Sequence, residues 1–117
     1  MTWQSIRLEL AETRDFPRGS ASRVYLLRLP LDAAGAIDEG ALTRLPARAT
    51  VRRFWPSQAD LSGRVVKTAQ GWAFAYAGGD PVIQPGLPAF HSGADVLLAE
   101  PDGTPLPFRV ARLERLN

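Results

Sequence analysis

The stretch from Val65 to Tyr76, VVKTAQGWAFAY, decides the fold class of this chain. In its second half three aromatic residues alternate with alanines, so a strand here has one aromatic face and one face of methyl groups. Gln70 and Gly71 stand between the two halves, and glycine accepts the positive φ that a two-residue hairpin turn requires. The predicted hairpin pairs Ala69 with Trp72, Lys67 with Phe74 and Val65 with Tyr76.

The aromatic row formed by Trp72, Phe74 and Tyr76 has two interpretations. It could be a platform on which a flat ligand stacks. Aromatic side chains repeated with a period of two more often form the buried face of a sheet, because they bury large apolar areas. We therefore expect this face to point into the core.

Strand patterns recur on both sides of this hairpin. Apolar and polar residues alternate over 5–11, residues 23–29 are apolar on both faces, and residues 50–55 form a strand pattern that stops at Pro56. Later in the chain, the Asp102-Gly103 turn separates the strand patterns of 95–100 and 104–110. Pro105 and Pro107 lack amides on the same side of their strand, which predicts an unpaired edge or a bulge there. Residues 109–116 fit either a strand or a helical turn.

A short helix is predicted between these strands, at about residues 39–45. Asp38 can accept hydrogen bonds from the free amides of the first turn, and Ile37 can pack on Leu42 as a hydrophobic staple. Pro46 ends the helix, because proline has no amide hydrogen to continue the hydrogen-bond ladder.

Several short strands and one helix in 117 residues predict a single domain spanning residues 1–117. We expect a mostly β fold, either a small antiparallel barrel or a compact sandwich of six to eight strands. Residues 78–94 hold too many glycines and prolines for a continuous strand. They are expected to form a long connection that can include a short edge strand.

The composition excludes several classes of chemistry. With no cysteine and one histidine, the chain has no disulfide, no thiol nucleophile and no Cys/His set for a metal ion. Phosphate-binding glycine loops and the G-x-S-x-G turn of hydrolases are missing, so neither a cofactor nor a catalytic residue is expected. No run approaches the roughly 18 apolar residues of a membrane span, and the chain does not begin with a signal-peptide pattern. These features predict a soluble, cytoplasmic domain of bacterial type with no membrane partner.

Positive charge is concentrated in the middle third of the chain. Residues 41–70 sum to +5, whereas residues 1–40 sum to −1 and residues 71–117 to −2. Arg48, Arg52, Arg53 and Lys67 could line the phosphates of a nucleic acid while Trp55 stacks on a base, provided that they share one exposed surface. The alternative is that they only solvate strand faces, because 13 arginines against one lysine are typical of a GC-rich genome.

The lone histidine, His91, lies in the glycine- and proline-rich segment, with Asp80 and Asp95 near it in sequence. Histidine is the usual general base near neutral pH, and a carboxylate can orient its ring. No spacing around His91 matches a catalytic template, so we expect a loop histidine that bonds to backbone or water and is not catalytic.

Trp3 falls on the same side of the first strand as Arg7 and Glu9, the polar face, if that strand is regular. An exposed tryptophan there would indicate a contact surface, for example with a second copy of the chain.

Three functional hypotheses follow, in this order. The first is a non-catalytic binding or scaffold module, which contacts an unknown protein partner or a second copy through residues 78–94 and 52–56. The second is nucleic-acid binding through the basic segment 44–67, and the third is an enzyme or small-ligand pocket around His91. The candidate binding residues are Arg48, Arg52, Arg53, Trp55, Lys67 and His91.

Overall fold

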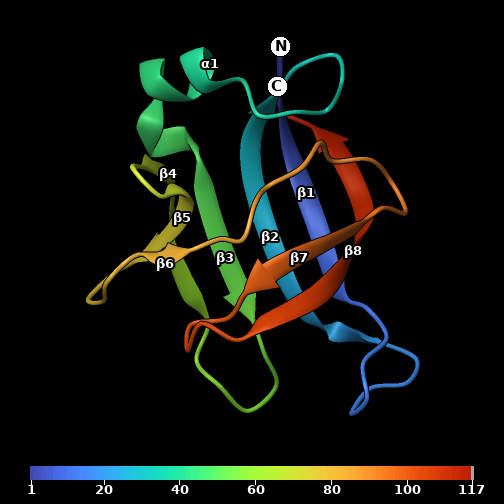
Figure 1. Ribbon diagram of the computed structural model, residues 1–117. Coiled ribbons are helices and arrows are strands. Elements are labelled where there is room, and N and C mark those ends of the chain that lie inside the picture. The colour runs from blue at the N-terminus through green and yellow to red at the C-terminus, as the bar shows by residue number, and fades with distance from the viewer. Residues whose placement is uncertain (117) are drawn as a thin grey trace.

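Eight antiparallel strands, one short helix and a 3-10 turn make up the computed structural model, which describes residues 1–116 (Figure 1). The strands are β1 (Thr2–Leu10), β2 (Ser20–Leu31), β3 (Thr50–Phe54), β4 (Leu61–Thr68), β5 (Gly71–Tyr76), β6 (Val82–Ile83), β7 (Asp95–Ala99) and β8 (Pro105–Arg115). Helix α1 spans Glu39–Arg44, and the 3-10 turn spans Pro46–Arg48.

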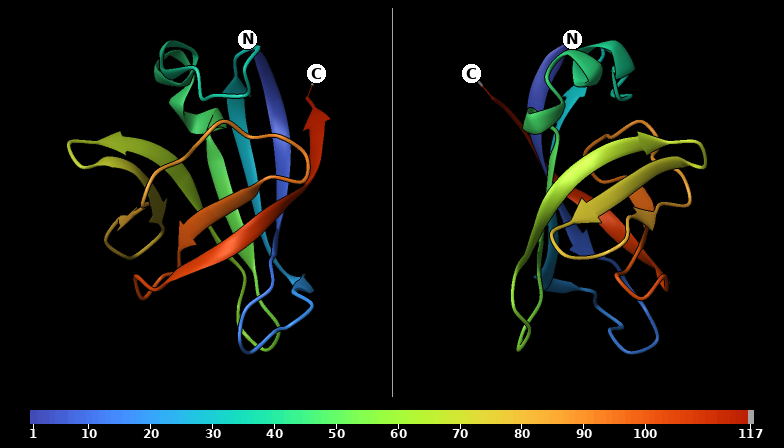
Figure 2. Two further views of the ribbon diagram at one scale, coloured as in Figure 1. Left: turned by 45° about the vertical axis from the view of Figure 1, so that its right-hand side comes forward. Right: turned by 90° about the vertical axis from the view of Figure 1, so that its left-hand side faces the viewer.

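The strands form one sheet in the order β6-β5-β4-β3-β2-β1-β8-β7. Strands consecutive in the chain are therefore neighbours, except β6 and β7, and β8 returns to pair with β1. The sheet curls into a nearly closed barrel with a seam between β6 and β7 (Figure 2). This arrangement confirms the predicted mostly β class and selects the barrel over the sandwich.

The core fills the lumen of the barrel. Alternation along each strand sends every second side chain inward, and strand pairing brings these residues into rows such as Ile6, Leu27 and Val51. Tyr25 lies in the centre of the lumen, with its ring 5.0 Å from that of Phe108 and 5.9 Å from that of Phe74. The largest fully buried side chains are Tyr25, Phe74, Phe90, Phe108, Ile6, Leu8, Leu27, Leu29, Leu31, Leu98, Val51 and Val65.

The β4–β5 hairpin forms as predicted, but the predicted register is wrong by two residues. The observed pairs are Thr68 with Gly71, Lys67 with Trp72 and Val65 with Phe74. The Thr68 hydroxyl closes the turn early, because it accepts from the Gln70 amide at 3.1 Å and donates to the Gly71 carbonyl at 2.8 Å. A two-residue shift keeps the alternation, so Phe74 still faces the core and is fully buried.

Helix α1 begins and ends close to the predicted residues. The Asp38 side chain accepts a hydrogen bond from the Ala41 amide at 3.0 Å, and Leu45 caps the other end before Pro46 starts the 3-10 turn. Figure 1 places this segment at one end of the barrel, which we call the helix end. The loops 11–19, 55–60 and 100–104 lie at the opposite end, which we call the loop end. Within residues 1–116, no helix is long and apolar enough to cross a membrane.

Trp3 is not the exposed contact residue that was considered. Its pairing with Pro30 keeps it on the outer face of the sheet, in line with the alternation. The side chain is nevertheless only 7% exposed, because the segment after β2 folds back over it and brings the Arg48 guanidinium to 4.9 Å from its ring. Because Trp3 is covered, it does not support a contact surface for a second copy of the chain.

The long connection after β5 is tied down along its length. It contains the short edge strand β6, and its Phe90 ring is buried in the core. The Phe90 amide donates to the Gly35 carbonyl at 2.8 Å. Gly35 has φ +84°, and a Cβ on it would lie 2.7 Å from the Phe90 carbonyl oxygen, so only glycine fits there. Residues 84–94 thus cover the barrel instead of forming a free loop.

A single side chain bridges the seam between β6 and β7. Gln84 follows β6 and is 4% exposed. Its Oε1 accepts from the Ala99 amide at 2.8 Å, and its Nε2 donates to the Ala99 carbonyl at 3.3 Å. The Gln84 side chain therefore makes the two hydrogen bonds with Ala99 that the backbone of a neighbouring strand would otherwise make.

Strand β8 resolves two expectations about the last part of the chain. It continues to Arg115, so residues 109–115 are strand and not a helical turn. Its last pair with β1 is Phe108 with Leu10, and Pro105 and Pro107 lie beyond that point. Both prolines pair with β7 on one side of β8. On the other side β1 has already ended, so the missing proline amides face a side without a partner strand, as predicted.

We expect Phe74→Ala to destabilise the domain by about 3–5 kcal/mol, because it opens a cavity in the lumen. That is a large share of the roughly 5–15 kcal/mol that holds a domain folded. Chemical denaturation measures the loss, and Ile83→Ala, at a side chain 41% exposed, is the control with a change within about 0.5 kcal/mol. A loss below about 1 kcal/mol for Phe74→Ala would contradict the lumen position of the ring.

We expect Gln84→Ala to cost about 1–3 kcal/mol, because it leaves the Ala99 amide and carbonyl buried without partners. Hydrogen exchange should show faster exchange of the Ala99 amide. The neighbouring Glu100 amide, which donates to the Thr104 carbonyl at 2.8 Å, should exchange as before. Equal acceleration at both amides would mean that the whole β7–β8 hairpin opens and that Gln84 is no local bridge.

Candidate functional site

The structure separates the candidate binding residues predicted from the sequence. Arg48 and Arg52 are exposed on the outer surface, whereas Arg53 is buried in the lumen. Trp55 directly follows β3, at the start of the 55–60 loop, and is half-buried. The expectation that the basic side chains share one exposed surface is therefore wrong for Arg53, because alternation with Val51 turns it inward.

Three arginines share the outer surface of the central strands, Arg28, Arg52 and Arg64, and a fourth, Arg48, is exposed in the 3-10 turn that precedes β3. We call this set the outer arginine face. Thr50 pairs with Arg28 on one side and with Arg64 on the other, so the two arginines flank it in one row across the sheet. The next row contains Arg52, between Leu26 and Ser62. Residues directly paired point to the same side of a sheet, so these side chains crowd together on its outer side.

The outer arginine face lacks compensating negative charge. Strands β2, β3, β4 and β5 contain no aspartate or glutamate at all. Within residues 1–116 none of the four arginines forms an ion pair, whereas on the adjacent strands Arg7 pairs with Glu9 at 2.9 Å and Arg112 with Glu114 at 3.3 Å. Positive charge is therefore concentrated on the side of the barrel formed by β2, β3 and β4.

This face also has a shape and hydrogen-bond donors suited to an anion. A shallow hollow of about 230 Å³ lies between β2, β3 and β4, with Arg28, Arg52, Thr50 and Ser62 in its walls. Guanidinium forks bind phosphate or carboxylate oxygens in pairs, and hydroxyl groups add single donors. The Arg52 guanidinium lies 4.8 Å from the half-buried Phe54 ring.

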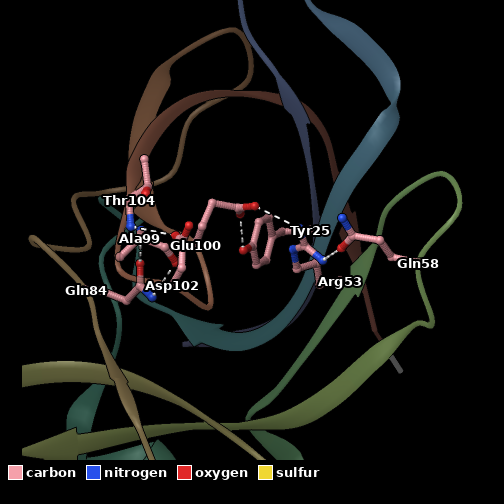
Figure 3. Close-up of polar contacts among 8 residues, drawn as sticks. All are labelled: Tyr25, Arg53, Gln58, Gln84, Ala99, Glu100, Asp102 and Thr104. Carbon is pink, nitrogen blue, oxygen red and sulfur yellow. Dashed lines mark hydrogen bonds and ion pairs between the residues drawn. The ribbon is translucent and has the colours of Figure 1, made fainter.

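Arg53 belongs instead to a polar network inside the lumen (Figure 3). One terminal nitrogen donates to Glu100 Oε1 at 2.8 Å, and the other donates to Gln58 Oε1 at 2.9 Å. Tyr25 donates its hydroxyl to the second oxygen of Glu100. Both carboxylate oxygens are thereby used, and the charges of Arg53 and Glu100 compensate each other.

The surroundings of Tyr25, Arg53 and Tyr76 raise the pKa of all three side chains. Burial, the nearby Tyr76 and the bond to Glu100 raise the pKa of Tyr25 far above its usual value. Burial acts to lower the pKa of Arg53, but its hydrogen bond to Glu100 and the charge of that carboxylate outweigh this and raise it. Burial raises the pKa of Tyr76 to about 12. Tyr25, Arg53 and Tyr76 therefore keep their protons near pH 7.

A cavity of about 410 Å³ opens at the loop end, above this network. Its apolar wall contains Trp55, Leu61 and Leu106, and its polar wall contains Gln58, Asp102 and Thr104. The Trp55 ring has the Arg53 guanidinium at 4.1 Å and that of Arg23 at 5.8 Å. Trp55 thus lines this cavity and not the outer arginine face.

The two remaining candidates, Lys67 and His91, lie apart from both sites. Alternation puts Lys67 on the side of β4 opposite to Arg64, and its ammonium group lies 4.8 Å from the Trp72 ring, near the tip of the β4–β5 hairpin. His91 is exposed, and its ring has no hydrogen bond or ion pair with any residue in the described chain. Asp95 lies within 3.5 Å of Arg109 instead. No group of three metal-ligating side chains occurs in residues 1–116.

Sequence reasoning missed Tyr25, Glu100 and Gln84. The first two carry a signal in the alternation, because Glu100 follows the inward residues Val96 and Leu98 at the same spacing. An acid and a base that both point inward, as Glu100 and Arg53 do, are expected to pair, because burying an unpaired charge costs free energy. Gln84 carries no such signal, since its partner is the backbone of a residue on a distant strand.

We expect Arg53→Met to cost about 3–5 kcal/mol, because Glu100 then stays buried without a cation. Replacing the whole network with apolar groups, in Arg53→Met with Glu100→Leu and Tyr25→Phe, should cost less than Arg53→Met alone. Chemical denaturation of both variants makes the comparison. A triple variant that is less stable than Arg53→Met would show that the network contributes net stability.

The chain matches no family model, no curated protein and no solved structure. Its function is therefore inferred from its own residues.

Proposed function

We propose that this domain is a non-catalytic binding module that takes single-stranded nucleic acid on its outer arginine face. The observation that carries the proposal is the cluster of Arg28, Arg52 and Arg64 on strands that contain no acidic residue, with Arg48 in the 3-10 turn that precedes β3. Surface arginines are usually interspersed with acids, and a one-sign patch on a protein of net charge +2 favours polyanions.

Phosphate fits the donors on this face. Arginine forks bind two phosphate oxygens at once, and the Thr50 and Ser62 hydroxyls add donors between the guanidinium groups. Such contacts go to the nucleic-acid backbone, so the binding is independent of base sequence.

A single strand fits the fold better than a duplex. Reading a duplex normally needs a helix or β-ribbon that enters the major groove, and the one helix of residues 1–116 has six residues. A curved sheet with basic side chains instead suits an extended strand, as in other single-strand binding surfaces. The half-buried Phe54 beside Arg52 offers an aromatic edge, in place of the Trp55 ring expected from the sequence.

The other hypotheses have less support. Residues 78–94 were expected to supply adaptable contacts, but Gln84 and Phe90 bind this segment to the barrel. The hypothesis of a pocket around His91 lacks a carboxylate partner for the ring in the described part of the chain. An acidic protein surface remains the competing partner for the arginines, and the experiment below separates it.

We expect the domain to bind a fluorescent single-stranded oligonucleotide with a Kd tighter than the roughly 10⁻⁴ M of weak nonspecific contacts, in anisotropy measurements at about 50 mM salt. Log affinity should fall with log salt at roughly 0.7 per phosphate contact, so three contacts give a slope of about −2. The variant Arg28→Gln with Arg52→Gln and Arg64→Gln should lose at least about tenfold in affinity and most of this slope.

The matched control is Arg14→Gln with Arg18→Gln and Arg115→Gln, three exposed arginines outside β2, β3 and β4 that form no ion pair within residues 1–116, so it removes the same charge elsewhere. Equal losses in both variants would show that only net charge matters and would overturn the site. No binding at about 50 mM salt would overturn the proposal itself. Poly-glutamate tests the competing partner. If it binds as tightly as the oligonucleotide and loses affinity in the same variants, the partner of the outer arginine face is an acidic protein and not a nucleic acid.

A further inference from the structure

We propose that the seam between β6 and β7 is a docking site for one extended peptide segment of a partner protein, which pairs with the free edge of β7 as an added strand. Within residues 1–116 the sheet ends at β6 on one side and at β7 on the other. A free strand edge is a template for another strand, because its amides and carbonyls have no partner in the sheet. The proposal is independent of nucleic-acid binding, since the seam and the outer arginine face share no residues.

The edge of β7 carries unused backbone groups. The Ala99 amide and carbonyl point into the seam, where they bond to the Gln84 side chain. Alternate residues of an antiparallel strand bond to the same side, so Asp95 and Leu97 also point their amides and carbonyls into the seam, and the residues between them bond to β8. Within residues 1–116 no backbone hydrogen bond joins Asp95 or Leu97 to β6 or to the chain that follows it.

Gln84 shows that a peptide group fits into the seam. Its side-chain amide accepts from the Ala99 amide at 2.8 Å and donates to the Ala99 carbonyl at 3.3 Å, as the backbone of a paired strand does. The backbones of β6 and β7 do not pair with each other, and this one amide group spans the distance between them. The peptide groups of an added strand would continue the row of hydrogen bonds that Gln84 begins.

Apolar side chains flank the seam on the outer side of the barrel. Four large apolar residues are exposed in residues 1–116, and two of them border the seam: Ile83 on β6, at 41%, and Leu97 on β7, at 47%. A branched apolar side chain on the outward face of an added strand would pack beside them and lose contact with water. Inward side chains must be small, because Phe74 and Phe90 already fill the lumen. The expected segment therefore alternates branched apolar residues with small ones.

The sequence leaves this edge able to pair. Natural sheets block free edges with proline or lysine, because both discourage a further strand. The free end of β8 follows this rule, since Pro105 and Pro107 lack amides on the side without a partner. β7, with the sequence DVLLA, contains neither proline nor lysine. One free edge is therefore blocked, and the other is not.

The occupant is a segment without a sheet of its own, and not a second copy of this chain. A strand of a second copy would bring its neighbouring strand with it, and that neighbour would need the space of the chain after β6. This chain is held at Gln84 and at Phe90, whose amide donates to the Gly35 carbonyl at 2.8 Å (Figure 1). A single extended segment needs no such space.

The test uses the peptide acetyl-KVSVSVK-amide as the probe in a ¹H–¹⁵N NMR titration of the full chain. We expect the largest shifts at the Asp95 and Leu97 amides and slower hydrogen exchange at Leu97, while the Val96 amide, bonded to β8, exchanges as before. The control peptide carries N-methylated valines. In an antiparallel pair the outward valines point their amides at β7, so their loss should weaken binding at least about tenfold.

Leu97→Lys should weaken binding of the probe at least about fivefold, because it removes the apolar contact and places a charge at the edge. Leu45→Lys, at a residue 46% exposed near the helix end, is the matched control and should bind within about twofold of the unaltered chain. No shift at about 1 mM peptide, equal binding of the N-methylated peptide, or equal effects of the two variants would each overturn the proposal. A concentration-dependent dimer that Leu97→Lys abolishes would assign the edge to a second copy instead.

Discussion

The buried ion pair between Arg53 and Glu100 is the interaction on which the rest of the barrel depends. Arg53 projects from β3 and Glu100 stands at the end of β7, so their bond joins the two halves of the sheet across the lumen (Figure 3). Tyr25 adds a third strand to this junction. Removing two charges from water is costly, and the cost is met only when further hydrogen bonds complete the pair. Gln58 and Tyr25 supply two of those bonds, and Arg53 Nε is left buried without a partner within residues 1–116.

The same ion pair explains why neighbouring arginines of the basic segment differ in their surroundings, one on the outer side of the sheet and one in the lumen. Arg52 and Arg53 are neighbours in sequence, yet alternation along β3 sends one to solvent and the other to the lumen. Arg53 forms an ion pair with Glu100, whereas Arg52 forms no ion pair within residues 1–116. Positive charge is therefore compensated by Glu100 inside the barrel and left uncompensated on its outer side.

Much of the fold could be predicted because period-two patterns are local. The aromatic row of β5, the alternation of β1, the Asp38 cap and the Asp102-Gly103 turn each act within a few residues, and each lies where it was expected. The hairpin register was missed because the Thr68 hydroxyl, and not the glycine, positions the turn. Trp3 was missed because a segment more than forty residues later in the chain covers it.

The candidate site was less predictable than the fold. Composition identified the middle third as the basic part of the chain, and Arg48 and Arg52 do lie on the outer surface. Arg28 was overlooked because it stands outside that segment and joins it only through strand pairing. The lumen network needed knowledge of which strands face each other, which no local pattern contains.

The Gln84 bridge places the weak point of the barrel away from the ends of the chain. β1 and β8 pair from Gln4 to Leu10 with one register shift, and the Leu116 amide donates to the Trp3 carbonyl at 2.9 Å, whereas β6 and β7 share no strand pairing in residues 1–116 and Gln84 supplies hydrogen bonds across their seam. Joining Trp3 and Leu116 through a linker and opening the chain between Gln84 and Phe90 would give a circular permutant that runs from β7 through β8 and β1 to β6. In that permutant each strand would follow its neighbour in the sheet, and the seam would coincide with the two new termini.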